Sequence, residues 1–196
     1  MFFNKKIILA SKSRSRAQIL KKNNIKFYQK KPKAEEEEIK KQNKKASTKK
    51  LTEVLATAKA RSIKVENTLV VGSDTAIDLG GETINKAKNM KEAKEKIIKL
   101  SGKEHSIFSS VVCFYNNKLV WKTTQKTTVK IRKLSKKEAK EYINTCGKQI
   151  LSSVGCYQIE KNGPNIIEGI DGDFFNVMGF PLFPFLKFLK KFNMKQ

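Results

Sequence analysis

The chain has 196 residues, a formal charge of +24 and a hydrophobic fraction of 39%. This length and hydrophobic content fit one domain with one core, so we treat residues 1–196 as a single domain. The chain has an odd number of cysteines, three, and none of them form a C-x-x-C pair. This argues against a disulfide framework or a zinc site. No signal peptide or membrane-length apolar run occurs, so we expect a cytoplasmic protein without a membrane span.

The basic excess consists almost entirely of lysine, which supplies 38 of the 42 basic residues. Proteins that read nucleic acid favour arginine, and here the lysines are spread along the chain and mixed with glutamate. We therefore interpret the charge as solvated surface and expect no specific nucleic-acid partner. Weak, salt-sensitive binding to polyanions or acidic membranes follows from the charge alone.

The first half of the chain alternates between apolar strands and helical patterns. The predicted elements are a strand at 5–10, a helix at 16–25, a charged loop or solvated helix at 31–50, a helix at 51–65, a strand at 67–74, and a hairpin that turns at Gly80 and Gly81.

The second half continues the alternation with clearer caps. The predicted elements are a helix at 90–100 capped by Asn89, two long strands within 105–133 that turn at Asn116 and Asn117, a helix from a capping box at 135–138 to Cys146, short strands at 156–160 and 166–170, and a C-terminal helix. Alternating strands and helices predict an α/β fold with a mixed sheet.

The common nucleotide-binding loops are absent, and the only histidine, His105, is interpreted as structural. Asp74 follows the most apolar strand, where ligands bind in open α/β sheets. On residue type alone, Asp74 either binds a divalent cation or activates water, or else it caps a turn with Thr75. The segment 11–16, "SKSRSR", fits a phosphate-binding site and an ordinary helix cap equally well.

Five segments in order resemble the Maf family of nucleoside triphosphate pyrophosphatases. They are "LASKSRSRAQIL" at 9–20, "VVGSDTAIDLGGETINKAK" at 70–88, "LSGKEHSIFSSV" at 100–111, "VGCYQIEKNG" at 154–163 and "IEGIDGDFFNVMGFPL" at 167–182. The resemblance implies an elongated mixed β-sheet flanked by helices, with two lobes around a central cleft, as in inosine triphosphatases.

The resemblance also implies an activity and a site. The activity is metal-dependent hydrolysis of a modified or non-standard nucleoside triphosphate to the monophosphate and pyrophosphate, a house-cleaning role that uses Mg²⁺ or Mn²⁺. The implied residues are the catalytic and metal-binding Asp74, the metal-binding Glu36, and the substrate- or phosphate-binding Ser11, Arg16, Lys59, Lys86 and Glu160. The acidic run 35–38 leaves the register of Glu36 open by a residue or two.

Several positions depart from the family pattern. Ser15 replaces the first arginine of an Arg-Arg pair, and Ala87 replaces a proline. Ser152 and Ser153 stand where the thymidine and uridine branch has Asp-Lys. Glu160 favours the 7-methyl-GTP branch, whereas Thr75 favours the other, so the preferred base stays open.

Two other functions compete with the pyrophosphatase. One is a non-catalytic nucleotide- or polyanion-binding protein linked to cell division, suggested by the high charge and the missing contacts. The other is an inosine-triphosphatase-like enzyme. The identity of the metal and the choice between monomer and homodimer also stay open.

Overall fold

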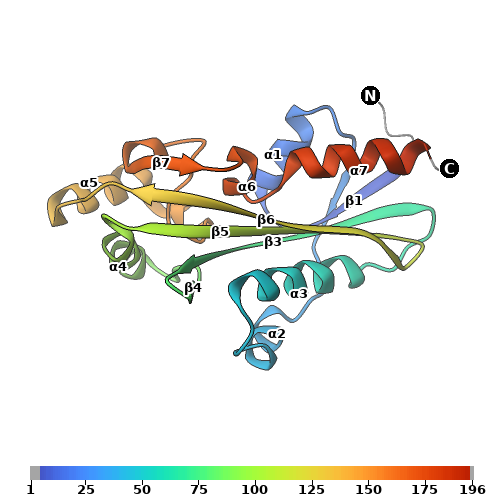
Figure 1. Ribbon diagram of the computed structural model, residues 1–196, viewed down its shortest axis with the longest axis horizontal. Coiled ribbons are helices and arrows are strands. Elements are labelled where there is room, and N and C mark those ends of the chain that lie inside the picture. The colour runs from blue at the N-terminus through green and yellow to red at the C-terminus, as the bar shows by residue number, and fades with distance from the viewer. Residues whose placement is uncertain (1–4, 195–196) are drawn as a thin grey trace.

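The computed structural model describes residues 5–194 and is built on one elongated, mixed seven-stranded sheet (Figure 1). The strand order is β2-β1-β3-β5-β6-β7, with β4 paired to β3. The strands are β1 (Lys6–Ala10), β2 (Tyr28–Lys30), β3 (Thr68–Leu79), β4 (Glu82–Ile84), β5 (Glu104–Tyr115), β6 (Lys118–Ile131) and β7 (Ile167–Asp171). Only β1 pairs in parallel, with β2 and β3, and all other pairs are antiparallel.

Helices cover both faces of the sheet (Figure 1). They are α1 (Arg14–Lys22), α2 (Glu36–Gln42), α3 (Thr48–Arg61), α4 (Met90–Leu100), α5 (Lys136–Cys146), α6 (Phe174–Val177) and α7 (Leu182–Met194), with 3₁₀ turns at Gly147–Ser152 and Gly163–Asn165. α2 and α3 lie on one face, α1, α6 and α7 lie on the other, and α4 and α5 cover one end. The predicted mixed α/β architecture is thus confirmed.

The buried apolar side chains form two large cores at opposite ends of the sheet and a small one under α3. One large core packs α4 and α5 against the sheet, and the other packs α1 and α7 against it. β3 contributes side chains to all three, through Ile77, Leu69 and Val70 respectively. The middle of β3 therefore lies between the two large cores and carries polar residues there.

Local signals placed most elements correctly. Asn89 caps α4, and the capping box of Ser135 and Glu138 opens α5. Asn116 and Asn117 adopt φ of 49° and 61°, the left-handed conformation that a two-residue hairpin needs. Among residues 5–194, no helix has the length and apolar content needed to cross a bilayer.

Two predictions were wrong in detail. The strand predicted at 156–160 is a series of turns, because Cys156 has a φ of 55° and leaves the extended conformation. The strand predicted to end at Asp74 continues to Leu79, because β5 pairs with it past that point, with Asp74 opposite Ser110. Its parallel pairing with β1 ends at Gly72. Asp74 therefore lies in the middle of a strand, just beyond the end of β1.

Candidate active site

The site begins with an unusually close contact between α3 and β3 at Gly72. A Cβ atom on Gly72 would lie 2.2 Å from the carbonyl oxygen of Ala56 and 2.6 Å from the amide nitrogen of Ala60. Any larger residue would push the helix away from the strand. Glycine at this position thus brings Lys59, in the last turn of α3, next to Asp74, two residues further along β3.

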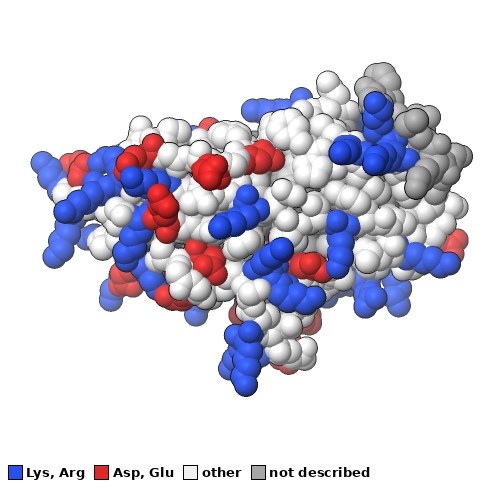
Figure 2. Space-filling view, viewed as in Figure 1, with Lys and Arg blue, Asp and Glu red and all other residues white. Residues whose placement is uncertain are grey.

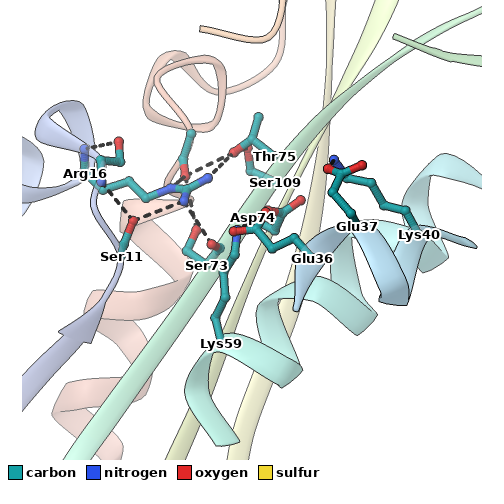
Figure 3. Close-up of polar contacts among 12 residues, drawn as sticks. Ser11, Arg16, Glu36, Glu37, Lys40, Lys59, Ser73, Asp74, Thr75 and Ser109 are labelled. Atoms are coloured by element: carbon teal, nitrogen blue, oxygen red, sulfur yellow. Dashed lines mark hydrogen bonds and ion pairs between the residues drawn. The ribbon is translucent and has the colours of Figure 1, made fainter. Parts of the chain in front are cut away.

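Lys59 lies between two carboxylates (Figure 3). Its Nζ is 2.6 Å from Oδ1 of Asp74 and 3.1 Å from Oε2 of Glu36. The side chains of Lys59 and Asp74 are only 8% and 10% exposed, whereas Glu36 is 43% exposed. Two carboxylates share one ammonium, so the cluster carries a net negative charge in a sparsely solvated place.

The structure distinguishes the members of the acidic run that precedes α3. Glu36, at the start of α2, reaches Lys59. Glu37 instead pairs with Lys40 at 2.8 Å, and Glu38 accepts a hydrogen bond from Gln42. Among these residues, Glu36 is therefore the one placed beside Asp74.

Arg16 joins three separate segments of the chain (Figure 3). Its Nε donates to the carbonyl oxygen of Gly179 at 2.9 Å, and Nη1 donates to the carbonyl of Ser73 at 2.9 Å and to Oγ of Ser11 at 3.3 Å. Nη2 donates to Oγ1 of Thr75 at 2.8 Å. The guanidinium is thus largely engaged by the protein itself and holds α1 and the α6–α7 loop against β3.

Burial lowers the pKa of Arg16, and the coulombic attraction of Asp74 and Glu36 opposes that shift. The guanidinium and the two carboxylates are therefore close enough to influence one another. Gly179 has a φ of +98°, which L-residues with side chains rarely adopt. That conformation aims its carbonyl oxygen at Arg16 and at the hydroxyl of Ser73.

Lys86 faces the same group of charges from the segment after β4. Its side chain reaches solvent, yet neighbouring protein atoms partly desolvate the ammonium and lower its pKa, and repulsion from Arg16 and Lys59 lowers it further. Within residues 5–194 it makes no direct hydrogen bond or ion pair. It is therefore a free cation near Asp74, suited to an incoming anion.

Glu160 lies on the turn after Cys156 and is not a partner of Lys59. Its Oε1 accepts a hydrogen bond from the hydroxyl of Ser15 at 3.0 Å. Ser15 is the position that departs from the family's arginine pair, and it adjoins Arg16 in α1. The substitution therefore places a neutral hydroxyl, in place of a cation, against this half-buried carboxylate.

Comparison with known proteins shows which family the chain belongs to. The family model described as Maf-like protein matches residues 6–192. The chain belongs to the Maf-like family. A 7-methyl-GTP pyrophosphatase of Bartonella quintana is 41% identical over 92% of each chain, and one of Bartonella henselae is 38% identical over 96% of each. A nucleoside triphosphate pyrophosphatase of Caulobacter vibrioides is 31% identical over 94% of each.

Solved structures give a weaker likeness to this Maf-like chain. The Staphylococcus aureus Ham1 protein overlaps it with a TM-score of 0.39 and 15% sequence identity. The overlap covers 64% of this chain and 70% of that protein.

The oxygen donors of this Maf-like site suit a divalent cation that is shared with a substrate. Glu36 and Asp74 converge on one point, which the ammonium of Lys59 takes up. No group of three or more potential ligands among His, Cys, Asp and Glu forms within the described part of the chain. Mg²⁺ commonly binds one or two carboxylates, with waters and substrate phosphates completing its shell. Two carboxylates therefore fit a cation that arrives with a nucleotide.

The sequence did not predict that Ser11, Ser73, Thr75 and Gly179 hold Arg16. The hydroxyl of Thr75 lies 3.0 Å from that of Ser109, which donates to the carbonyl of Asn176. Gly179 stands more than 160 residues from Arg16 in the chain. The glycine inside the "NVMGFPL" segment was the one feature of the sequence that pointed to this contact. The sequence does not indicate which side chain the carbonyl of that glycine faces.

Proposed function

We propose that this chain hydrolyses a nucleoside triphosphate at its α-phosphorus and releases the nucleoside monophosphate and pyrophosphate. The observation that carries the proposal is the cluster of Asp74, Lys59 and Glu36, with the unpaired Lys86 nearby. The names of the Maf-like relatives support the same reaction.

In this proposal Asp74 is the general base. A carboxylate within reach of the attacking water can accept its proton. Lys59 also holds that carboxylate in place, because its Nζ lies 2.6 Å from Oδ1. Lys86 is free to pair with phosphate oxygens, which carry most of the charge on the substrate.

We propose a divalent cation, Mg²⁺ or Mn²⁺, as the cofactor, held by Glu36 and Asp74. When bound, such a cation supplies charge neutralisation for the phosphates and for the departing pyrophosphate. In this scheme Arg16 holds α1 and the α6–α7 loop against β3 and does not contact the phosphates. Its donors already bind Ser11, Ser73, Thr75 and Gly179. We propose the cytoplasm as the place of action, where nucleotide pools and reduced thiols coexist.

We further propose 7-methyl-GTP as the preferred substrate. Methylation at N7 gives the guanine base a positive charge, which a half-buried carboxylate can stabilise. Glu160 is such a carboxylate, and its partner Ser15 is neutral. The two relatives of 38% and 41% identity carry this substrate in their names.

A triphosphate panel with one matched pair of variants tests the proposal. Purified protein with Mg²⁺ or Mn²⁺ should convert 7-methyl-GTP to its monophosphate and pyrophosphate, faster than dTTP, UTP or ITP. Glu36→Gln should raise the metal concentration needed for half-maximal rate about tenfold or more. Glu37→Gln, one residue away and paired with Lys40 outside the site, should leave it unchanged.

Equal metal requirements of the two variants would remove Glu36 from the metal site. Nucleotide binding without turnover would favour the non-catalytic binder, and faster turnover of ITP would favour the inosine-triphosphatase-like alternative.

A further inference from the structure

An exposed aromatic surface lies where α6 meets α7. Phe174 is 45% exposed and Phe183 is 62% exposed. Phe175 connects them, with ring centroids 6.1 Å from Phe174 and 5.5 Å from Phe183. The three rings form one contiguous apolar area at the junction of the two helices.

Exposed lysines continue this surface along α7. Phe183, Lys187 and Lys190 follow the i, i+4, i+7 spacing of one helix face, and Lys191 adjoins them. The helix contains no aspartate or glutamate. Figure 2 shows basic residues over the second half of α7 next to a pale area over the start of α7, with acidic residues at the α6 end.

The opposite face of α7 is fixed in the core, which gives the exposed face one orientation. Phe185 and Leu189 are buried beneath it. Phe188 stacks on Trp121 of β6 with centroids 4.8 Å apart and an interplanar angle of 10°. The packing of the inner face therefore determines which side chains of α7 are exposed.

We propose that the α6–α7 surface, made of Phe174, Phe183, Lys187, Lys190 and Lys191, binds the face of an anionic lipid bilayer. Aromatic rings enter the headgroup region, and lysines beside them pair with lipid phosphates, the combination found on interfacial helices. The nearest carboxylate in sequence, Asp173, is engaged by the amide of Phe175 at 2.8 Å. This inference does not depend on the proposed hydrolase activity.

Charge complementarity favours lipid over a second copy of the chain. If two copies of α7 packed together in a two-fold interface, the three lysines would meet no acidic partner, because α7 contains no aspartate or glutamate. An anionic bilayer supplies many phosphates at once and a soft apolar layer for both rings.

Vesicle co-sedimentation of the full chain tests the proposal. We expect binding at about 0.15 M salt to vesicles that are about one third phosphatidylglycerol, and none to pure phosphatidylcholine. Lys187→Gln, Lys190→Gln and Lys191→Gln together should weaken binding about 100-fold, since each lysine near the surface contributes about fivefold. Phe174→Ser with Phe183→Ser should weaken it about tenfold or more.

The matched control removes three exposed lysines of α5, through Lys136→Gln, Lys137→Gln and Lys140→Gln. It has the same net charge as the α7 variant and should bind within about threefold of the wild type. Equal weakening by both triple variants would overturn the proposal in favour of diffuse charge. Unchanged binding by the double phenylalanine variant would also overturn it, in favour of a purely ionic polyanion contact.

Binding of a second copy of the chain to the α6–α7 surface would give a different, measurable result. Sedimentation velocity would then show a dimer that the phenylalanine variant dissociates, while vesicle binding of that variant stays at the wild-type level. That pair of results would contradict the lipid proposal. Triphosphate hydrolysis by every variant reports independently on the proposed function.

Discussion

At the scale of single residues, Lys59 balances the charge of the site. Within residues 5–194 its ammonium is the only direct partner of the carboxylates of Glu36 and Asp74, at 3.1 Å and 2.6 Å. Removing it leaves two carboxylates close together, one of them almost fully buried. Such a pair is unstable alone, yet it is a better site for a divalent cation.

Lys59→Met should therefore lower the free energy of unfolding by about 3 kcal/mol in metal-free buffer. Mn²⁺ should then raise the melting temperature of this variant by more than that of the wild type, because the cation replaces the missing ammonium. Differential scanning fluorimetry over a Mn²⁺ series measures both effects without reference to activity.

Lys99→Met is the control for this substitution. Lys99 also lies 2.6 Å from a carboxylate, that of Glu82, but both side chains are exposed. Its loss should cost less than about 1 kcal/mol and create no response to Mn²⁺. Identical Mn²⁺ shifts for wild type and Lys59→Met would argue against a cation between Glu36 and Asp74.

Single residues also mark the limit of prediction from sequence. Asp74 and Lys59 could be anticipated, and the structure places them in direct contact. The hydrogen bonds of Arg16 could not be anticipated, because three of them go to backbone carbonyls or hydroxyls that are distant in the chain. Backbone acceptors carry no residue-type signature, so a motif cannot reveal that an arginine is already occupied.

At the scale of elements, the contact of α3 with β3 sets the geometry of the site. Gly72→Ala should lower the free energy of unfolding by about 3 kcal/mol, because its Cβ would meet backbone atoms of α3 at 2.2 Å and 2.6 Å. Activity should fall at least tenfold as well, since displacement of α3 separates Lys59 from Asp74. Urea unfolding and steady-state kinetics measure these effects.

Gly169→Ala in β7 is the matched control, because nothing lies within 4 Å of the added Cβ. We expect a change within about 0.5 kcal/mol and normal kinetics. If Gly72→Ala behaved like this control, α3 would not depend on close contact at Gly72.

Elements with local signals were predictable, and elements defined by long-range pairing were less so. The capping residues Asn89 and Ser135 mark the starts of α4 and α5 within their own turns. The strand predicted at 67–74 and the first arm of the predicted hairpin form one strand, β3, because both pair with β5, whose residues lie some 30 positions away. The misassigned strand near Cys156 is apolar enough for a strand, but its left-handed backbone is a tertiary outcome.

At the scale of the whole molecule, buried His105 makes stability depend on pH. Desolvation lowers its pKa from 6.5 to about 4, and its Nε2 lies 2.6 Å from the hydroxyl of Tyr157. The unfolded chain binds the proton more readily between these values. Stability is therefore greatest above pH 6.5 and falls as the pH drops towards 4.

Between pH 7.5 and pH 5, this group should remove about 2 kcal/mol of unfolding free energy. Urea titrations at the two pH values measure the loss, and His105→Gln should abolish most of it. The pKa of Glu138 is lowered to about 2, so its own contribution to acid sensitivity begins below this window. An unchanged pH dependence in His105→Gln would rule out this histidine as the cause.

The central claim is that water attacks the α-phosphorus of 7-methyl-GTP at the site of Asp74. Hydrolysis in ¹⁸O-labelled water, followed by mass spectrometry, identifies the phosphorus that the water attacks. We predict the label in the monophosphate and none in pyrophosphate, with no detectable turnover by Asp74→Asn. Label in pyrophosphate or in free phosphate, or full activity of Asp74→Asn, would contradict the account.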